Sequence, residues 1–225
     1  MIDRSSATTL LLVRHAETDD NMAMRLSGWT DSHLSQRGER QVSLLAEHFN
    51  GAHAGVAEIY SSPLIRARRT AEAISSLTGH SLILLDDLRE MYFGDLDGRP
   101  YEELKEAYAD LLAGDEDADR EDFMWPNGES RSGFAERSLS VINQIARAHV
   151  GQSVGVVTHG GIISVFLALM NGESTANWRR WTVPNASLSE VLWFPDAGRG
   201  ELLRHGEYAH LGPLEEPGEP WATSP

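Results

Sequence analysis

In Leu10-Leu-Leu-Val-Arg14-His15-Ala-Glu-Thr18, four consecutive apolar residues lead directly into an arginine and a histidine. An apolar run of this length with polar residues on both sides is typical of a strand buried on both faces of a parallel sheet. Ligands of such sheets bind at the carboxyl ends of the strands. The pattern therefore predicts that Arg14 and His15 lie at the rim of a cleft.

Size and composition indicate a single acidic domain. The 225 residues, 41% of them hydrophobic, suffice for one well-buried core but hardly for two. We assign this domain to residues 1–212 and expect a disordered acidic tail at 213–225. The formal net charge of -15 disfavours nucleic acid and anionic membranes as partners. The chain has no cysteine, no secretion-signal pattern and no apolar run of membrane-spanning length, which predicts a cytoplasmic location.

Strand and helix patterns alternate along the chain. Further strands are predicted at 57–60, 81–85 and 154–158, a terminal hairpin at 187–194 and 201–205, and helices at 36–50, 63–77, 101–113, 134–149 and 162–170. Ser35 and Ser62 are the expected caps of the first two helices, and 18–33 is expected to be a long loop at the cleft mouth. The alternation predicts a three-layer α/β sandwich with a mostly parallel sheet flanked by helices, plus a helical insertion over the cleft at about 99–130.

Three further residues with suitable chemistry follow predicted strands. Arg66 lies just beyond the second strand, Glu90 a few residues beyond the third, and His159 directly after the fourth. A guanidinium group matches the oxygens of a phosphate, and Gly160 and Gly161 allow close backbone approach at a helix start. A carboxyl group beside bound phosphate tends to keep its proton and can protonate a leaving oxygen. Together these residues indicate a phosphate-binding site.

Each residue also has a structural interpretation. A histidine after a strand is more often a hydrogen-bonded structural residue than a nucleophile, and His159-Gly-Gly can be only a tight turn. Arg66 can belong to a surface run of arginines, and Glu90 can form a surface ion pair with Arg89. Their convergence on one sheet edge favours the functional interpretation. The remaining histidines show no metal-binding spacing and are expected to be solvent-facing or structural; they are residues 33, 48, 53, 80, 149, 205 and 210.

Two histidines and two arginines around one phosphoryl group indicate nucleophilic catalysis. We expect the neutral imidazole of His15 to attack phosphorus. Arg14, Arg66 and His159 would hold the phosphoryl oxygens, and Glu90 would protonate the leaving alcohol. Water would then cleave the phosphohistidine. The cationic side chains would replace the charge neutralisation of a metal, so neither a metal nor a cofactor is expected.

The sequence resembles the histidine phosphatase superfamily, also called the phosphoglycerate mutase-like family, over most of its length. The similar blocks occur in the family's order and are Arg14-His15-Ala-Glu-Thr-Asp-Asp-Asn21, Gly28-Trp-Thr-Asp with Leu34-Ser-Gln-Arg-Gly38, Ser62-Pro-Leu-Ile-Arg66-Ala-Arg-Arg-Thr-Ala71, Leu88-Arg-Glu90 with Phe93-Gly94, Gly128-Glu-Ser130 with Phe134 and Arg137, and Thr158-His159-Gly-Gly161. The resemblance implies a phosphorylated His15, a phosphoryl group bound by Arg14, Arg66 and His159, a contact from Asn21, and Glu90 as the proton donor. Ala16 stands where the family more commonly has glycine.

The segment from Glu90 to Gly98 is compact and resembles the phosphatase branches, because it lacks the extended basic segment with an ERHYG-like motif that is typical of the mutases. This favours a metal-independent phosphatase for small phosphate monoesters of the sugar phosphate or phosphoglycerate type. Phosphoglycerate mutase is the alternative, since Gly28-Trp29-Thr30-Asp31 also suits that branch. A non-catalytic phospho-ligand binding module is a third interpretation, which the presence of Glu90 disfavours.

The residues that select the substrate are less well indicated. The predicted substrate-binding set is Asn21, Gly28, Trp29, Tyr101 and Gly160, with further candidates at Tyr92, Phe123 and Trp125. Each aromatic residue is at least as well explained by packing. The acidic run at 115–122 would disfavour polyanionic substrates if it faces the cleft. The resemblance also raises a homodimer, for which the chain gives no independent support.

Overall fold

The computed structural model describes residues 4–107 and 123–214, and its centre is a six-stranded sheet in the order β3-β2-β4-β1-β5-β6. The strands are β1 (Thr8–Arg14), β2 (Ile59–Ser61), β3 (Leu82–Leu84), β4 (Ser153–Thr158), β5 (Leu188–Phe194) and β6 (Arg199–Glu207). β3, β2, β4 and β1 are parallel, whereas β5 and β6 form an antiparallel hairpin that adds to β1. The predicted mostly parallel sheet and terminal hairpin are confirmed.

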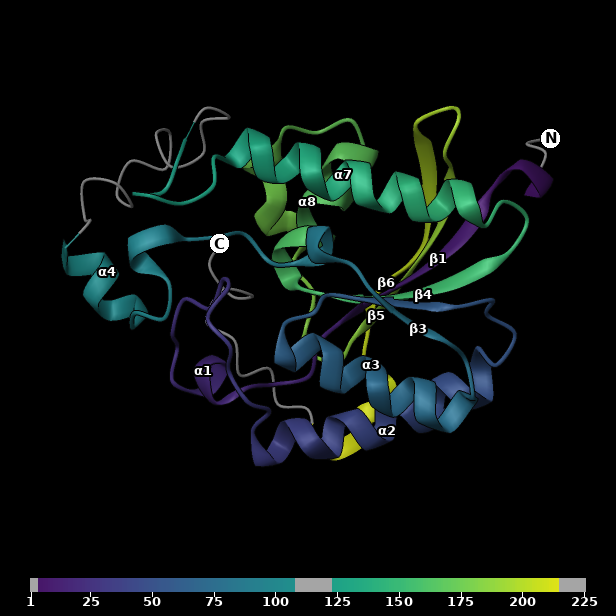
Figure 1. Ribbon diagram of the computed structural model, residues 1–225, viewed down its shortest axis with the longest axis horizontal. Helices are drawn as coiled ribbons and strands as arrows, with labels where there is room; N and C mark the ends of the chain where they lie inside the picture. Colours follow the sequence, from purple (N-terminus) through teal and green to yellow (C-terminus); the bar gives the residue numbers. More distant parts are fainter. Residues whose placement is uncertain (1–3, 108–122, 215–225) are drawn as a thin grey trace.

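Helices cover both faces of this sheet (Figure 1). α2 (Gln36–Ala52) and α3 (Ile65–Thr78) pack on one face, and α7 (Arg131–Ala148) and α8 (Gly160–Met170) pack on the other. Leu10 and Leu12 of β1 join the core beneath α7 and α8, while Leu11 and Val13 join the core beneath α2 and α3. Because alternate side chains enter different cores, every position of the run must be apolar. The three-layer sandwich is confirmed.

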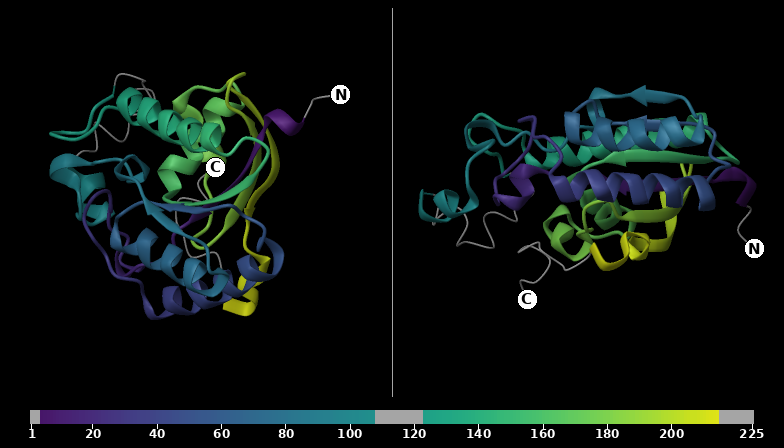
Figure 2. Two further views of the ribbon diagram at one scale, coloured as in Figure 1. Left: turned by 45° about the vertical axis from the view of Figure 1, so that its right-hand side comes forward. Right: turned by 90° about the horizontal axis from the view of Figure 1, so that it is seen from below.

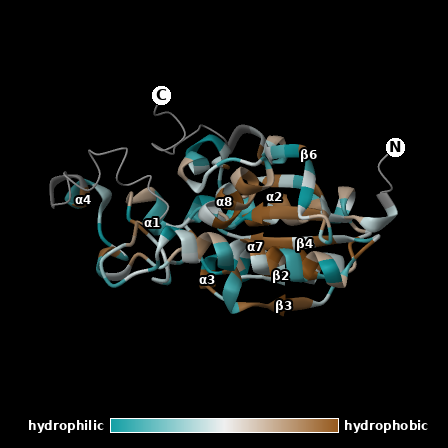
Figure 3. Cartoon of the chain, turned by 90° about the horizontal axis from the view of Figure 1, so that it is seen from above, coloured by the Kyte–Doolittle hydropathy of each residue, from teal (hydrophilic) through white to brown (hydrophobic). Residues whose placement is uncertain are grey.

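Shorter elements gather at one end of the sheet. α1 (Asp19–Met22) and α4 (Tyr101–Ala107) lie beyond the end at which β1 and β4 finish (Figure 2). Figure 3 shows apolar residues concentrated in the strands and α8. Further short 3-10 helices span Arg4–Ser6, Asp86–Leu88, Gly94–Leu96, Thr175–Trp181 and Ala209–Leu214. In the part of the chain that the structure describes, no helix has both the length and the apolar character needed to cross a membrane.

Three predicted segments lie partly or wholly outside the described residues. The expected helix 101–113 is observed as far as Ala107, and the acidic run 115–122 lies outside the described ranges. The same holds for 215–225 of the expected tail. The placement of the insertion over the cleft therefore stays a prediction.

The prediction that Ser62 caps α3 and that Pro63 takes the first helical position is wrong. α3 begins at Ile65, and the N–H group of Ile65 donates to Oδ1 of Asp31 at 2.8 Å. A carboxylate from the preceding loop thus satisfies the helix start, where negative charge is also favoured by the helix dipole. Ser62 instead contacts His159, as described below.

The first loop is also more structured than predicted. Residues 18–33 contain α1, which begins with a reciprocal capping box between Thr18 and Asn21. Ser35 caps α2 as predicted, through a 2.9 Å hydrogen bond from the N–H group of Gly38, but the helix continues past its expected end at Asn50 to Ala52. This small difference at a helix end does not affect the cleft.

Candidate active site

Three neighbouring parallel strands bring the predicted residues to one edge of the sheet. Arg14, the last residue of β1, is paired with Thr158, the last residue of β4. His15 and His159 therefore leave the sheet side by side, and their ring centroids lie 5.2 Å apart in an edge-to-face arrangement. Arg66 enters the same region from the start of α3, just beyond β2. His15 is 4% exposed, His159 0% and Arg66 1%, so the chemistry lies in a nearly dry environment.

The surroundings of His15 define its protonation state. Its Nδ1 lies 2.8 Å from the carbonyl oxygen of Ala16. A carbonyl oxygen only accepts hydrogen bonds, so Nδ1 carries the hydrogen and the lone pair of the neutral ring is on Nε2. Burial, followed by the charges of Arg66 and Arg14, holds the pKa of His15 well below its usual value. His15 is therefore neutral at pH 7 and has the form that a nucleophile requires.

His159 has the opposite arrangement of its ring nitrogens. Its Nε2 lies 2.8 Å from Oγ of Ser62, while its buried Nδ1 has no hydrogen-bond partner among the described residues. Oγ of Ser62 also accepts from the N–H group of Leu64 at 3.3 Å, and its hydroxyl hydrogen can donate to Nε2. Burial first, and then Arg66, lowers the pKa of His159 well below its usual value. The neutral ring thus carries its hydrogen on Nδ1, a buried donor suited to an anion.

Arg66 has both a structural and a chemical side. Its Nη1 donates to the carbonyl of Thr30 at 3.0 Å, and its Nη2 donates to the carbonyls of Ser27 and Gly28 at 3.1 and 2.7 Å. Arg66 therefore anchors the loop before α2. Its Nε is buried and has no hydrogen-bond partner among the described residues, so this nitrogen is a donor that a ligand can use.

Arg14 and Gly160 lie against each other at the start of α8. Nη1 of Arg14 donates to the carbonyl of Val183 at 2.6 Å. A Cβ atom at position 160 would lie 3.3 Å from Nε of Arg14. The absence of a side chain at Gly160 thus lets the guanidinium group approach the helix N-terminus, where an anion would also be favoured.

Glu90 lies beside the same helix N-terminus. Its Oε1 accepts from the N–H group of Met91 at 2.8 Å, and its Oε2 accepts from that of Gly161 at 2.9 Å. A Cβ atom at Gly161 would collide with this carboxyl group. Burial raises the pKa of Glu90 and outweighs the opposing effect of these two N–H groups and the nearby arginines. The environment therefore favours a protonated carboxyl group, as a proton donor requires.

The alternative interpretation of Glu90 as a partner of Arg89 does not match the structure. Arg89 instead pairs with Asp86 at 2.9 Å, and its guanidinium carbon lies 5.0 Å from the centre of the Trp29 ring.

Gly28 and Trp29 connect the first loop to the segment around Glu90. The N–H groups of Gly28 and Trp29 both donate to the carboxylate of Asp97, at 2.8 and 2.6 Å. Nε1 of Trp29 donates to the carbonyl of Glu90 at 2.9 Å, and its ring remains 41% exposed. Gly28 thus contributes through its backbone, whereas Trp29 offers a partly open aromatic surface directly beside Glu90.

Asn21 and Tyr101 have clear local roles. Oδ1 of Asn21 accepts from the N–H group of Thr18 at 3.1 Å and from Nδ2 of Asn185 at 3.3 Å, which fixes the orientation of its amide. The N–H group of Tyr101 donates to the carbonyl of Met24 at 2.9 Å at the start of α4. Their predicted contacts with substrate stay predictions.

The other aromatic candidates pack against one another. Trp125 forms edge-to-face contacts with Phe93 and Phe123, and its Nε1 donates to the sulfur of Met91 at 3.1 Å. Tyr92 lies 5.1 Å from Trp29, measured between ring centres. The packing interpretation therefore accounts for Trp125 and Phe123.

Several contacts that hold the site residues in place are not visible in the local sequence. Asn185 donates to the carbonyl of His15 at 3.0 Å although 170 residues separate them, and no local pattern indicates this contact. Ser62, Glu129 and Arg137 stand within the blocks of the family resemblance, so their presence was visible but their partners were not.

The model of the histidine phosphatase superfamily (branch 1) matches residues 10–207. A metal-independent phosphoserine phosphatase of Arabidopsis thaliana is 33% identical over 199 residues, which cover 86% of this chain and 82% of that protein. A probable phosphoglycerate mutase GpmB of Photorhabdus laumondii is 32% identical over 187 residues, covering 80% and 82%. The solved structure of a mycobacterial glucosyl-3-phosphoglycerate phosphatase has 29% identity and a TM-score of 0.76, covering 90% of this chain and 100% of that one. The match over residues 10–207 and the geometry of the site show that the chain belongs to branch 1 of the histidine phosphatase superfamily.

Proposed function

We propose that this chain is a metal-independent phosphatase that hydrolyses small phosphate monoesters through a phosphohistidine on His15. One observation carries the proposal. A neutral, buried His15 with its lone pair on Nε2 lies next to the ring of His159, whose buried Nδ1 has no hydrogen-bond partner among the described residues, and a carboxyl group of raised pKa lies at the adjacent helix start. This combination supplies a nucleophile, an oxygen-binding donor and an acid in one place.

In the first step, the Nε2 lone pair of His15 attacks phosphorus. A P–N bond forms as the P–O bond to the leaving group breaks, and Glu90 gives its proton to the departing oxygen. Arg14, Nε of Arg66 and the Nδ1–H group of His159 stabilise the negative charge on the remaining phosphoryl oxygens. The product alcohol leaves and Glu90 is ionised.

In the second step, water attacks the phosphorus of the phosphohistidine. The Glu90 carboxylate takes a proton from this water as the new P–O bond forms. The P–N bond breaks, its electron pair returns to Nε2 of His15, and inorganic phosphate is released. Glu90 is protonated again, so both residues regain their starting states.

We place the physiological substrate among monoesters of the sugar phosphate or phosphoglycerate type. The names of the relatives support this choice, since they describe enzymes for phosphoserine and glucosyl-3-phosphoglycerate. The exposed ring of Trp29 beside Glu90 is suited to contact the leaving group. We expect no nucleic acid or membrane partner.

A mutase is the second candidate, because one relative is named a probable phosphoglycerate mutase. A mutase must return the phosphoryl group to a second alcohol before water reaches it. A non-catalytic binding module is disfavoured, because binding alone gives no reason for an acid such as Glu90.

The test is phosphate release without added metal and with a chelator present. The panel contains phosphoserine, 3-phosphoglycerate, sugar phosphates and an aryl phosphate, with a His15→Ala control. Release that disappears in the control supports the proposal, and the ranking identifies the substrate class. Conversion of 3-phosphoglycerate to the 2-isomer with a bisphosphate primer, without release, would establish the mutase, and inactivity in both assays would favour the binding module.

A cytoplasmic location and a homodimer complete the proposal. Fractionation of cells that express the full chain tests the location. Light scattering on the purified protein tests the dimer, and a mass of one chain would exclude it.

A further inference from the structure

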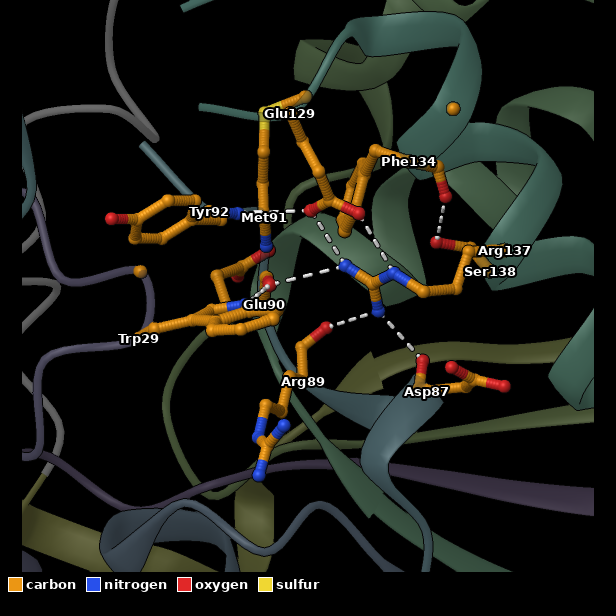
Figure 4. A network of polar contacts seen from close by, with 12 residues as sticks. Trp29, Asp87, Arg89, Glu90, Met91, Tyr92, Glu129, Phe134, Arg137 and Ser138 are labelled. Atoms are coloured by element: carbon orange, nitrogen blue, oxygen red, sulfur yellow. Dashed lines mark hydrogen bonds and ion pairs between the residues drawn. The ribbon is translucent and has the colours of Figure 1, made fainter. Parts of the chain in front are cut away.

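Arg137 and Glu129 form a network around the backbone of Glu90 (Figure 4). Arg137 is in α7, and Glu129 lies just before this helix. Nε and Nη2 of Arg137 donate to Oε1 and Oε2 of Glu129 at 2.8 and 2.7 Å, a bidentate pair. The side chains are 16% and 23% exposed. A planar pair of this kind is well oriented, and partial burial protects it from screening by salt.

Arg137 also donates to three backbone carbonyl groups just before and at Glu90. Its Nη1 donates to the carbonyls of Asp87 and Arg89 at 2.7 and 2.8 Å, and its Nη2 reaches the carbonyl of Glu90 at 3.3 Å. The guanidinium carbon lies 5.2 Å from the centre of the buried Phe134 ring, which limits its movement on the other side. One side chain of a packed helix therefore fixes the approach of the chain to the proton donor.

Glu129 holds the backbone on the far side of Glu90. Its Oε2 accepts from the N–H group of Tyr92 at 2.9 Å, and its own N–H group donates to the carbonyl of Tyr92 at 2.8 Å. Trp29 adds a hydrogen bond to the carbonyl of Glu90. The backbone is thus held on both sides of Glu90, whose side chain reaches the start of α8.

We propose that the Arg137–Glu129 pair is a positioning device for the Glu90 proton donor. The inference rests on the proposed function, in which Glu90 protonates the leaving oxygen. The segment around Glu90 lies between the 3-10 helices Asp86–Leu88 and Gly94–Leu96 and belongs to no helix or strand, so backbone ladders do not hold it. Proton transfer requires the carboxyl group within hydrogen-bond reach of that oxygen, and a displacement of about 1 Å can cost on the order of 100-fold in rate.

The experiment uses two substrates that differ in their need for an acid. An alkyl phosphate has a poor leaving group, whose oxygen requires protonation. The leaving group of p-nitrophenyl phosphate is p-nitrophenolate, a stable anion that needs little help from an acid. Arg137→Lys keeps the charge but loses the bidentate fork, and Glu129→Gln keeps the shape but loses the charge. We expect kcat on the alkyl phosphate to fall about 10- to 100-fold in both variants, and kcat on p-nitrophenyl phosphate to fall less than about 3-fold.

A second arm tests whether the effect acts through Glu90. In a Glu90→Gln background there is no acid left to position, so adding Arg137→Lys should change kcat on the alkyl phosphate by less than about 2-fold. Arg147→Lys is the matched control, because Arg147 is in the same helix but pairs with Asp196 at 3.5 Å on the exposed side. Arg147→Lys should leave kcat on both substrates unchanged.

The outcomes separate this inference from the proposed function. The inference applies if the wild-type protein releases phosphate and Glu90→Gln loses activity on the alkyl phosphate. In that case, an equal fall in kcat on both substrates in Arg137→Lys would show a purely structural role and overturn the inference. An additive loss in the double variant would overturn it too. No release of phosphate by the wild type would refute the proposed function and the inference together.

Discussion

The ends of β1 and β4 are built alike yet present their histidines in opposite ways. Each strand is buried, each ends at the same edge, and each is followed directly by a histidine. At the end of β1, His15 uses Nδ1 to reach a carbonyl oxygen, so Nε2 has the lone pair. At the end of β4, His159 uses Nε2 to reach a hydroxyl, so Nδ1 remains for a ligand.

This difference explains how two identical side chains can have different tasks. A carbonyl oxygen forces the hydrogen onto the nitrogen beside it, whereas a hydroxyl group can donate and push the hydrogen to the far nitrogen. The first arrangement yields a nucleophile and the second a hydrogen-bond donor. The partner of each ring, more than the position of the histidine in the strand, decides the task.

The largest expected effect comes from removing each histidine. His15→Ala should lower kcat by about 10⁴-fold or more, because the nucleophile is lost, whereas His159→Ala should lower it by about 10²- to 10³-fold, because one oxygen-binding donor is lost. Steady-state kinetics combined with acid-quench trapping of labelled phosphoprotein measure both. His159→Ala should still form the labelled protein and His15→Ala should not. Label retained in His15→Ala would mean that the two tasks are exchanged.

A smaller effect is expected when the hydroxyl that orients His159 is removed. Ser62→Ala should lower kcat about 10-fold, because the ring is then free to place its hydrogen on either nitrogen. Ser62→Thr keeps the hydroxyl group and serves as the control. Nitrogen NMR shifts of the His159 ring should show the loss of the preferred tautomer in Ser62→Ala alone. Equal activity of Ser62→Ala and wild type would show that the hydroxyl group of Ser62 does not orient His159 for catalysis.

The smallest effect is a shift in pH dependence. The active form of His15 is unprotonated and its pKa is lowered, so the acid limb of kcat/KM lies below the usual histidine range. The active form of Glu90 is protonated and its pKa is raised, so activity falls as pH rises through that raised value. The profile should therefore be a bell, with an acid limb from His15 and an alkaline limb from Glu90.

Glu90→Gln tests this assignment on an aryl phosphate. The alkaline limb that belongs to Glu90 should disappear, while the acid limb of His15 stays where it is. An unchanged alkaline limb would mean that another group titrates there.

Much of the fold and of the site could be predicted from local patterns. The apolar runs before His15 and His159 predicted strands buried on both faces, and the carboxyl-end rule for parallel sheets then placed both histidines and Arg66 at one edge. The structure brings these residues together with Glu90 as expected, although their catalytic roles stay predictions. The local pattern is enough to predict these strands, because a strand buried on both faces must itself consist of apolar residues.

The cap of α3 shows where local patterns fail. Ser62 and Pro63 have the residue types of a helix start, yet Asp31, 34 residues earlier, takes the capping position. Ser62 accepts from the N–H group of Leu64, whereas Asp31 accepts from that of Ile65, and only the path of the first loop brings this carboxylate to the helix start. The same holds for the hydrogen bond from Asn185 to His15.

The sequence by itself determined the mostly parallel sheet, the polar residues that follow its strands and the resemblance to one family. Apolar runs and short motifs carry this information, because they are properties of neighbouring residues. Only the tertiary structure decided which nitrogen of His159 is free and how Glu90 is held, because these depend on hydrogen bonds that Ser62, Arg137 and Glu129 make across the fold. Such contacts join segments far apart in the chain, and their geometry exists only once the layers are packed.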